Sequence, residues 1–211
     1  MRITVMGKGS VPGQVKTRLE PHLGPKKCAL LNSAMMHDTL TRLQSLKKEA
    51  EIVLSVSGVP SRDDMPAGTV LERQQGSDLG ARMMREIARG FAAGHGAVIL
   101  IGTDHPTLPL PFVEEAMHAL STPESLVLGP SVDGGYYLIG MSAFYPELFR
   151  NMTWSTDSVF AETTARAAQL ETDLTILPLW YDVDTAEDLD RLLEELREGD
   201  MDCPRLLAVL F

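Results

Sequence analysis

Cysteine is scarce in this chain, and long apolar runs are missing from it. The two cysteines, Cys28 and Cys203, lie near opposite ends and have neither metal-binding nor redox spacing, so we expect packing residues in a reducing compartment. The longest apolar runs, Ala97–Ile101 and Leu206–Phe211, are far too short to cross a bilayer, and Met1–Ser10 lacks the apolar stretch of a signal peptide. These absences predict a cytoplasmic protein without membrane insertion.

Basic residues are fewer than acidic residues in this chain. Lys and Arg total 19 against 29 Asp and Glu, which gives a formal net charge of −10 and a pI near 4.9. The resulting field repels phosphates and excludes broad binding to a nucleic-acid polymer, although a local basic patch can still hold one nucleotide. The other proportions, 44% hydrophobic and 23% charged over 211 residues, predict one globular domain spanning residues 1–211.

Strand and helix signals alternate along the chain. Short apolar or β-branched segments predict strands at Arg2–Met6, Glu51–Ser57, Thr69–Arg73, Ala97–Ile101, Ser125–Gly129, Tyr136–Met141 and Leu174–Trp180. Helical spacing and capping signals predict helices after Pro25, from Ser77 or Asp78 to Ala93, from Pro109 or Pro111 to Leu120, within Asp157–Leu170, and after a capping box at Thr185 and Asp188. This order predicts a three-layer α/β sandwich with a mainly parallel central sheet, in which ligands bind at the carboxyl ends of the strands.

The loop after the first predicted strand, GKGSVPGQVKTRL, fits neither common phosphate-binding motif. A dinucleotide fingerprint needs glycine where Pro12 stands, and a Walker A loop needs glycine where Val15 precedes Lys16. The loop does carry three cations, Lys8, Lys16 and Arg18, in an otherwise acidic protein. Cationic side chains and glycine backbone N–H groups are the donors that phosphate oxygens need. The loop is therefore either a nucleotide-phosphate site or a solvated surface loop.

A single aspartate, Asp104, follows the most strongly predicted central strand in the segment IGTDHP. At the carboxyl end of a strand its carboxylate points into the ligand-binding crevice, where it can hold Mg²⁺ together with phosphate oxygens. The alternative is a helix cap, but the next helix is expected only from Pro109 onward. We interpret Asp104 as a metal ligand and His105 as a turn residue.

Two further carboxylates, Asp182 and Asp184, leave the last predicted strand. Residues two apart in an extended chain point the same way, so both side chains can face one crevice and serve a divalent metal or a substrate. Alternatively, Asp184 only supports the N-terminus of the helix that Thr185 and Asp188 cap.

The turn Asp133-Gly134-Gly135 joins two predicted strands and precedes Tyr136 and Tyr137. A hairpin needs only the Asp-Gly pair, so the second glycine leaves room for a ligand to approach. A tyrosine there offers a ring face or a hydroxyl group. The alternative is a structural hairpin with two tyrosines in the core.

Taken together, these segments resemble a known family. In chain order they are KGSVPGQVKTRL, QQGSDLGARM, IGTDHPTL, GPSVDGGYYLIG, MTWST and DVDTAEDL. From Met1 to about Leu193 the chain is similar to the bacterial group of GT-A-like glycosyltransferases of undetermined substrate, within the nucleotide-diphospho-sugar transferase superfamily. Nucleotidyltransferases of the same superfamily resemble it in the basic loop that ends in an arginine and in the Asp-Thr-x-Glu-Asp-Leu segment.

The resemblance implies a nucleotide lying over the loop after the first strand, with Lys16, Arg18 and Asp133 as catalytic residues. The nucleotide-binding residues implied are Lys8, Gly13, Lys16, Arg18, Gln75, Asp78 and Gly80. The implied ligands of Mg²⁺ or Mn²⁺ are Asp104 and Asp184. The implied second-substrate pocket comprises Gly134, Gly135, Trp154, Ser155 and Thr156.

Two positions depart from the family pattern. Ser10 stands where members typically carry proline, and Thr103-Asp104 replaces the Asp-x-Asp of metal-dependent glycosyltransferases. We expect a metal-dependent transferase that uses a nucleotide-activated donor, in the manner of glycosyltransferases, and a small-molecule acceptor. Two alternatives stay open: nucleotidyl transfer to a phosphorylated small molecule with release of pyrophosphate, and a nucleotide-binding module without turnover. The apolar tail Leu206–Phe211 either covers the core or joins a homodimer.

Overall fold

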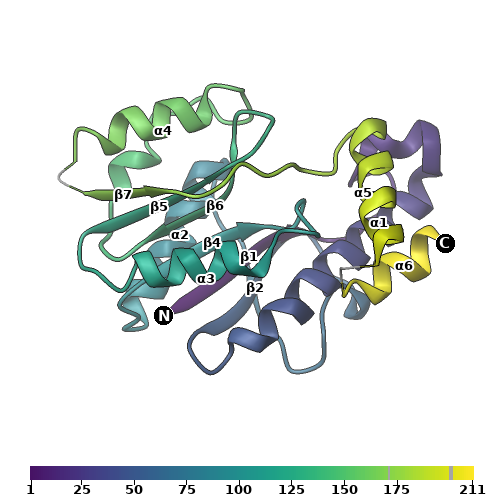
Figure 1. Ribbon diagram of the computed structural model, residues 1–211, viewed down its shortest axis with the longest axis horizontal. Coiled ribbons are helices and arrows are strands. Elements are labelled where there is room, and N and C mark those ends of the chain that lie inside the picture. The colour runs from purple at the N-terminus through teal and green to yellow at the C-terminus, as the bar shows by residue number, and fades with distance from the viewer. Residues whose placement is uncertain (171, 200–201) are drawn as a thin grey trace.

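A seven-stranded sheet forms the centre of the computed structural model, which describes residues 1–170, 172–199 and 202–211 (Figure 1). Its strands lie in the order β3-β2-β1-β4-β6-β5-β7. They are β1 (Arg2–Lys8), β2 (Glu51–Ser57), β3 (Val70–Arg73), β4 (Val98–Gly102), β5 (Ser125–Pro130), β6 (Tyr136–Met141) and β7 (Asp173–Ile176). The central strands β1 and β4 are buried along nearly their whole length, as expected of apolar, β-branched runs between two helical layers.

Mainly parallel pairing brings the carboxyl ends of the strands together. The pairs β1–β2, β2–β3, β1–β4 and β5–β7 are parallel, whereas β6 runs antiparallel to β4 and β5. All strands except β6 therefore end at one edge of the sheet. The chain moves outward from β1 to β3 and then returns to the other side of β1 with β4, so the strand order reverses between β1 and β4. Ligands of open α/β sheets bind in the crevice outside such a point.

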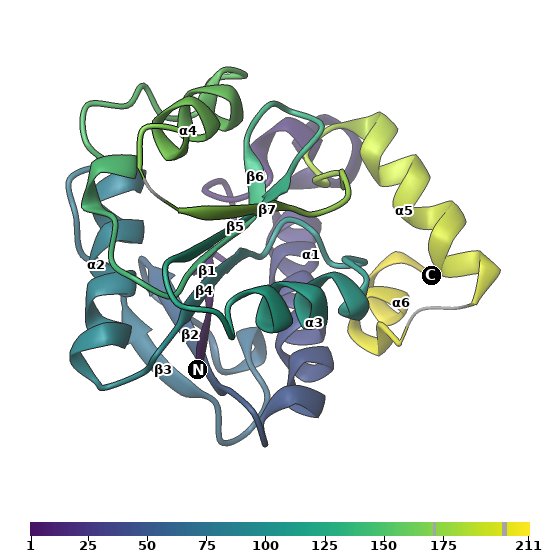
Figure 2. The same ribbon diagram turned by 60° about the vertical axis from the view of Figure 1, so that its left-hand side comes forward.

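Helices cover both faces of the sheet and form the three layers that the sequence predicts (Figure 2). α1 (Glu20–Leu43) and α3 (Leu110–Ala119) pack on one face, and α2 (Leu79–Ala92) and α4 (Val159–Ala167) cover the other. Each layer buries apolar side chains against alternate residues of the strands, because successive strand residues point to opposite faces. The predicted α/β sandwich is confirmed.

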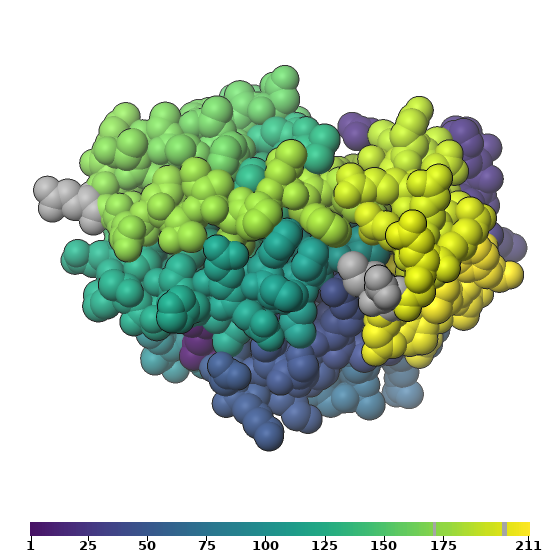
Figure 3. All heavy atoms as spheres, viewed as in Figure 1, coloured from purple at the N-terminus to yellow at the C-terminus, as the bar shows by residue number. Residues whose placement is uncertain are grey.

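The last two helices pack beside the start of α1 at one end of the molecule (Figure 3). α5 (Ala186–Glu198) and α6 (Pro204–Leu210) enclose an apolar cluster with α1. Leu206 is fully buried in this cluster, so the C-terminal segment covers part of the core, whereas Phe211 is exposed. No helix within the described ranges is long and apolar enough to cross a membrane.

The predicted strand Leu174–Trp180 is wrong in its second half, because β7 ends at Ile176. Leu177 still donates its N–H to the carbonyl of Leu128 at 2.9 Å. Pro178 has no N–H to donate, so the ladder cannot continue through it. Pairing resumes at Trp180, which forms an isolated parallel bridge with Ser131 and donates its N–H to the carbonyl of Pro130 at 3.1 Å.

The first helix has a break near its start. α1 spans Glu20–Leu43, but Gly24 has non-helical angles (φ 71°, ψ 158°), so the regular helix begins at Pro25, as the sequence predicts. The predicted caps are confirmed: Asp78 caps α2, and Thr185 forms a capping box with Asp188 at the start of α5. Glycine at position 24 permits the positive φ that other residues adopt only with strain.

Asp38 links α1 to α6 and should make a measurable contribution to stability. It is fully buried and accepts hydrogen bonds from the backbone N–H groups of Arg205 at 3.2 Å and Leu206 at 2.9 Å. Asp38→Ala leaves these two donors without their partner, which costs about 1–3 kcal/mol of the free energy of unfolding. Urea denaturation measures the loss. Exposed Asp63→Ala is the control and should stay within about 0.5 kcal/mol of wild type; equal stability of the two variants would contradict this role of Asp38.

Candidate active site

Three loops meet at the carboxyl edge of the sheet around the ammonium group of Lys16. Lys16 follows β1, Asp104 follows β4, and Asp184 lies between β7 and α5. Lys16 Nζ donates to Asp104 Oδ1, to Asp184 Oδ1 at 3.0 Å and to the backbone carbonyl of Val183 at 2.8 Å. Only 4% of the Lys16 side chain is exposed, against 47% for Asp104 and 37% for Asp184. The two predicted metal ligands therefore share one buried cation, which comes from the predicted phosphate loop.

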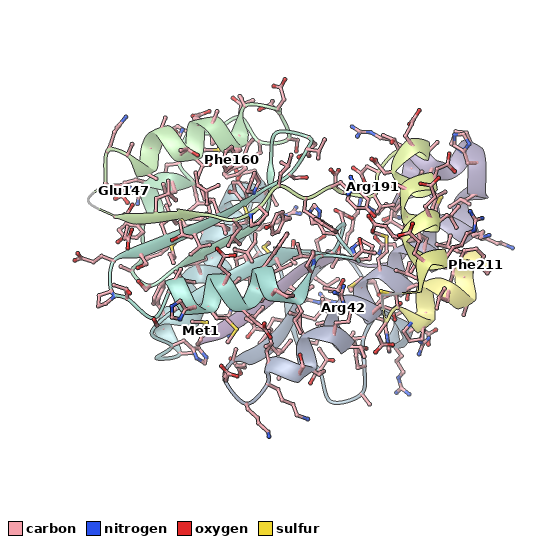
Figure 4. All side chains as sticks on the ribbon, in the orientation of Figure 1. Met1, Arg42, Glu147, Phe160, Arg191 and Phe211 are labelled. Carbon is pink, nitrogen blue, oxygen red and sulfur yellow. The ribbon has the colours of Figure 1, made fainter. Side chains whose placement is uncertain are left out.

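Hydrogen bonds to the backbone hold these loops in place. The N–H of Val183 donates to the carbonyl of Asp104 at 2.9 Å, which joins the loop after β4 to the segment before α5. Arg42 of α1, labelled in Figure 4, donates to the carbonyls of Pro106 at 2.6 Å and Leu108 at 2.7 Å. These bonds fix the path of the chain on both sides of the candidate site.

The ion pairs shift the pKa values of their members. Burial alone would lower the pKa of Lys16, but Asp104 and Asp184 outweigh this effect and raise it above its usual value. The side chain of Asp104 is 47% exposed, and partial loss of solvent in the cleft acts to raise its pKa. The positive charge of Lys16 outweighs this desolvation, so the pKa of Asp104 lies below its usual value. A further cation, Arg18, lies 3.8 Å from Asp184 Oδ2, and its side chain is 75% exposed. Both pKa shifts favour the charged forms of Lys16 and Asp104.

A cavity of about 580 Å³ opens on one side of the cluster. Its acidic lining residues are Asp104, Asp133, Asp157, Asp182 and Asp184, and its cationic lining residue is Arg18. Aromatic rings and hydroxyl groups also line it, from Tyr136, Tyr137, Trp154, Ser131, Ser155 and Thr156. The larger cavity thus offers flat apolar faces together with many hydrogen-bond acceptors.

A smaller cavity, of about 280 Å³, opens on the other side of the cluster and has a different lining. Asp104 and Asp184 line both cavities. The cations of the smaller cavity are Lys8, Lys16 and Arg82, and its amide side chains are Gln14, Asn32 and Gln74. The lysine and arginine side chains are donors for phosphate oxygens, so this lining suits an anionic group. The amide groups of Asn32 and Gln74 instead donate to acceptors within the protein.

Two glycines let the walls beside the larger cavity approach closely. A Cβ at Gly80 would lie 2.3 Å from Nε1 of Trp154, so the start of α2 packs directly against the indole. Gly134 has a φ of 86°, and a Cβ there would lie 2.2 Å from the carbonyl oxygen of Asp157. Both positions therefore require glycine for packing.

His105, interpreted from the sequence as a turn residue, is buried and lines the larger cavity. Its Nδ1 lies 2.8 Å from the carbonyl oxygen of Tyr181, so Nδ1 carries a proton and donates it. Burial lowers the pKa of His105 and raises the pKa of Asp182, which accepts a hydrogen bond from the Ser131 hydroxyl at 3.1 Å. One sequence signal could have identified His105 as a residue of the site: it directly follows Asp104 at the end of a central strand.

The structure gathers most of the predicted site residues around the two cavities. Those that line the larger one are Arg18, Asp104, Asp133, Gly135, Trp154, Ser155, Thr156 and Asp184, and those that line the smaller one are Lys8, Lys16, Asp104 and Asp184. Among the described residues, five predicted site residues line neither of these two cavities: Gly13, Gln75, Asp78, Gly80 and Gly134. Asp78 instead accepts the N–H of Ala81 at 2.8 Å as the cap of α2, and Gln74 rather than its neighbour Gln75 lines the smaller cavity.

Asp104 and Asp184 offer oxygen ligands to a divalent cation. One oxygen of each binds the Lys16 nitrogen, so the two carboxylates are close enough to share one ion, and each has a second oxygen that Lys16 does not bind. Across the part of the chain that the structure describes, no group of three or more His, Cys, Asp or Glu side chains is arranged to hold a metal. The pair therefore fits Mg²⁺ or Mn²⁺ when phosphate oxygens and water complete the coordination.

Replacement of Lys16 by methionine should change how stability depends on pH. In the native protein Lys16 lowers the folded-state pKa of Asp104, so this carboxylate stabilises the fold above its unfolded pKa of about 4 and loses that effect as the pH falls through the lowered folded value. In Lys16→Met the ammonium no longer offsets the repulsion between the two carboxylates, which raises the folded pKa of Asp104 and makes its deprotonation destabilising.

We therefore expect the melting temperature of Lys16→Met, relative to wild type, to rise as the pH is lowered from 7 toward 5. Thermal denaturation over this pH range provides the test. Lys26→Met, which removes an exposed lysine of α1, should follow the wild-type curve. Parallel curves for wild type and Lys16→Met would contradict the electrostatic coupling.

Comparison with known proteins identifies relatives of this chain. Residues 35–156 match the family described as "uncharacterized protein conserved in bacteria" (DUF2064). The crystal structure of a protein named as a nucleotide-diphospho-sugar transferase, from Desulfovibrio desulfuricans G20, is 30% identical, covers 99% of this chain and 95% of its own, and has a TM-score of 0.85. A comparison with curated proteins gives no match.

More distant structures share the fold alone. Rv0371c from Mycobacterium tuberculosis H37Rv, in complex with manganese, is 17% identical over 92% of this chain and 99% of its own, with a TM-score of 0.54. The CMP:2-keto-3-deoxy-manno-octonic acid synthetase complexed with CTP is 10% identical over 93% and 98%, with a TM-score of 0.59. The chain belongs to the bacterial family DUF2064 and has the fold of the nucleotide-diphospho-sugar transferases.

Proposed function

We propose that this protein is a divalent-metal-dependent transferase that uses a nucleotide-activated donor and transfers its glycosyl group, with residues 1–211 acting as one domain. One observation carries the proposal. The cluster of Lys16, Asp104 and Asp184 lies at the point where the strand order reverses, between a smaller cavity with a cationic lining and a larger acidic one. The name of the 30% identical relative supports the same class of reaction.

In this proposal the nucleotide lies over the loop after β1. Lys8 and Lys16, beside the smaller cavity, and Arg18, beside the larger one, donate to the diphosphate oxygens. Asp104 and Asp184 hold Mg²⁺ or Mn²⁺ together with phosphate oxygens, and the ion supplies positive charge that stabilises the diphosphate leaving group. The complex of Rv0371c with manganese supports a divalent metal in this fold.

The transferred sugar and the acceptor occupy the larger cavity. Trp154 contributes apolar surface beside the sugar, and the surrounding carboxylates accept hydrogen bonds from sugar hydroxyls. Asp133 accepts the N–H of Gly135 at 2.8 Å, which orients its carboxylate. From this position Asp133 orients the acceptor hydroxyl and takes its proton as the oxygen attacks. Arg18 adds positive charge where negative charge develops on the leaving diphosphate.

Nucleotidyl transfer is the second candidate, because Thr103-Asp104 lacks the Asp-x-Asp of metal-dependent glycosyltransferases. That reaction would use the same cations to hold a nucleoside triphosphate while a substrate phosphate attacks the α-phosphorus and pyrophosphate leaves. The lining of the larger cavity weighs against it. The carboxylates there would repel a phosphorylated substrate, and Arg18 is the one lysine or arginine among the described residues that line this cavity.

Asp104→Asn should abolish metal-dependent nucleotide binding. A thermal-shift panel of GTP, CTP, UTP, ATP and their diphospho-sugars, each with Mg²⁺, Mn²⁺ or chelator, measures this. A ligand of the folded state adds roughly 2.7 kcal/mol of stability at a hundredfold excess over its Kd, and we expect such a metal-dependent shift with one base in wild type. Asp63→Asn, exposed and outside both cavities, should retain the shift.

Two results would count against this proposal. Binding by Asp104→Asn equal to that of wild type would remove Asp104 from the metal-binding role. A wild-type protein that shows no shift with any nucleotide or nucleotide sugar would contradict nucleotide binding altogether.

The released product distinguishes the two transferase reactions. With the nucleotide sugar that binds, and water or a panel of sugars and amino sugars as acceptors, we expect release of nucleoside diphosphate, measured by chromatography. Asp133→Asn should slow this release by about 10²-fold or more, since it removes the group that takes the proton. Exposed Glu114→Gln on α3 should match wild type. Pyrophosphate release from a nucleoside triphosphate would favour nucleotidyl transfer, and binding without any product would leave a nucleotide-binding module.

A further inference from the structure

Lys16 lies between the two carboxylates to which a divalent cation would bind. We propose that Lys16 is an internal counter-cation that disfavours binding of the bare metal ion and gives way when phosphate arrives. The protein then binds the metal–nucleotide complex as one ligand. This inference rests on the proposed function, because it concerns the same metal and nucleotide.

The charges of the cluster are balanced before any ligand binds. An ammonium group has three N–H donors, and Lys16 Nζ has three acceptors, one oxygen each from Asp104, Val183 and Asp184. Arg18 lies 3.8 Å from the other oxygen of Asp184. Two carboxylates therefore face two cations, so within this cluster a bare divalent ion finds no carboxylate that lacks a counter-cation. To bind both carboxylates, it would also have to break hydrogen bonds that are already made.

Burial of Lys16 increases the penalty for such an exchange. With 4% of its side chain exposed, Lys16 cannot regain water without a rearrangement of the loop. A buried ammonium that loses its carboxylates and gains no other acceptor is strongly destabilising. Lys16 also has a left-handed backbone conformation, with φ of 49° and ψ of 38°, and such strain persists where surrounding contacts impose it. The contacts of its side chain with three oxygens are contacts of that kind.

Phosphate supplies the acceptor that makes the exchange possible. Lys16 lines the smaller cavity together with Lys8 and Arg82, so an anionic group bound there lies within the same cationic lining. When phosphate oxygens accept from the Lys16 ammonium, the inner oxygens of Asp104 and Asp184 become free for the metal that the phosphate brings. Lys16 thus exchanges carboxylate partners for phosphate partners and remains paired throughout.

Calorimetric titration of Mn²⁺ alone into nucleotide-free protein tests the inference. We expect wild type to bind Mn²⁺ weakly and Lys16→Met to bind it at least about tenfold more tightly, because the variant leaves two carboxylates without their counter-cation. Lys26→Met removes the same formal charge from the exposed surface of α1 and should match wild type. A merely structural ion pair would not produce this gain, since its loss would loosen the site. Equal affinities of wild type and Lys16→Met for Mn²⁺ would overturn the inference.

A second comparison uses wild type alone and therefore does not depend on the folding of the variant. Mn²⁺ alone should leave the melting temperature unchanged, whereas Mn²⁺ with the best ligand among GTP, CTP, UTP, ATP and their diphospho-sugars should raise it. Tight binding of Mn²⁺ alone, unaffected by the nucleotide ligand, would overturn the role of Lys16 and leave the proposed function standing. A protein that responds to none of these nucleotides and nucleotide sugars with Mn²⁺ would overturn the proposed function, and the inference with it.

Discussion

A buried ammonium group must find enough negative or polar partners to replace water, and in this protein that requirement shapes the candidate site. The three acceptors of Lys16 come from segments that follow different strands, at Asp104, Val183 and Asp184. Separation along the chain is large, 88 residues to Asp104 and 168 to Asp184. Because the charge is costly to leave unpaired, it holds the loops after β1, β4 and β7 in one arrangement. Electrostatics thus acts together with apolar packing, since Val183 beside Asp184 is fully buried in the cluster of α1, α5 and α6.

The topology of the sheet explains why the cleft has two different linings. Residues at the ends of β1 and β2, and just after β3, line the smaller cavity, as Lys8, Ser57 and Gln74 do. The other side of the reversal point contributes β4, β6 and the turn between β5 and β6, and the chain that returns from β7 brings Asp182 and Asp184. The cationic loop therefore faces the acidic segments across the line between β1 and β4. A transferase needs such a division, since it must hold an anionic leaving group and a hydroxyl-rich substrate side by side.

Local sequence patterns predicted the fold and the central residues of the site, because both depend on short-range signals. Strands end where their apolar runs end, and parallel strands end at one edge, so the loops that carry Lys16, Asp104 and Asp184 were expected to meet there. The family resemblance then singled out these three residues among the others of the loops. What the sequence missed depends on contacts between distant segments. The packing of Gly80 against Trp154 and the burial of His105 beneath the cleft are of this kind. No local pattern distinguishes a glycine that binds a ligand from one that accommodates an indole ring.

In the proposed function, the net charge of −10 would give a bound metal a role beyond stabilising the leaving group. A nucleoside triphosphate that approaches this protein is repelled by its overall field and, at the cleft, by the carboxylates of the larger cavity. Complexation with a divalent ion cancels two of the negative charges of the ligand before it arrives. The cations of the β1 loop then have only the remaining charge to neutralise, over distances at which screening is weak. For an acidic protein with few cations, joint entry of metal and nucleotide is thus the electrostatically favoured route, and the pairing of Lys16 with both carboxylates is consistent with it.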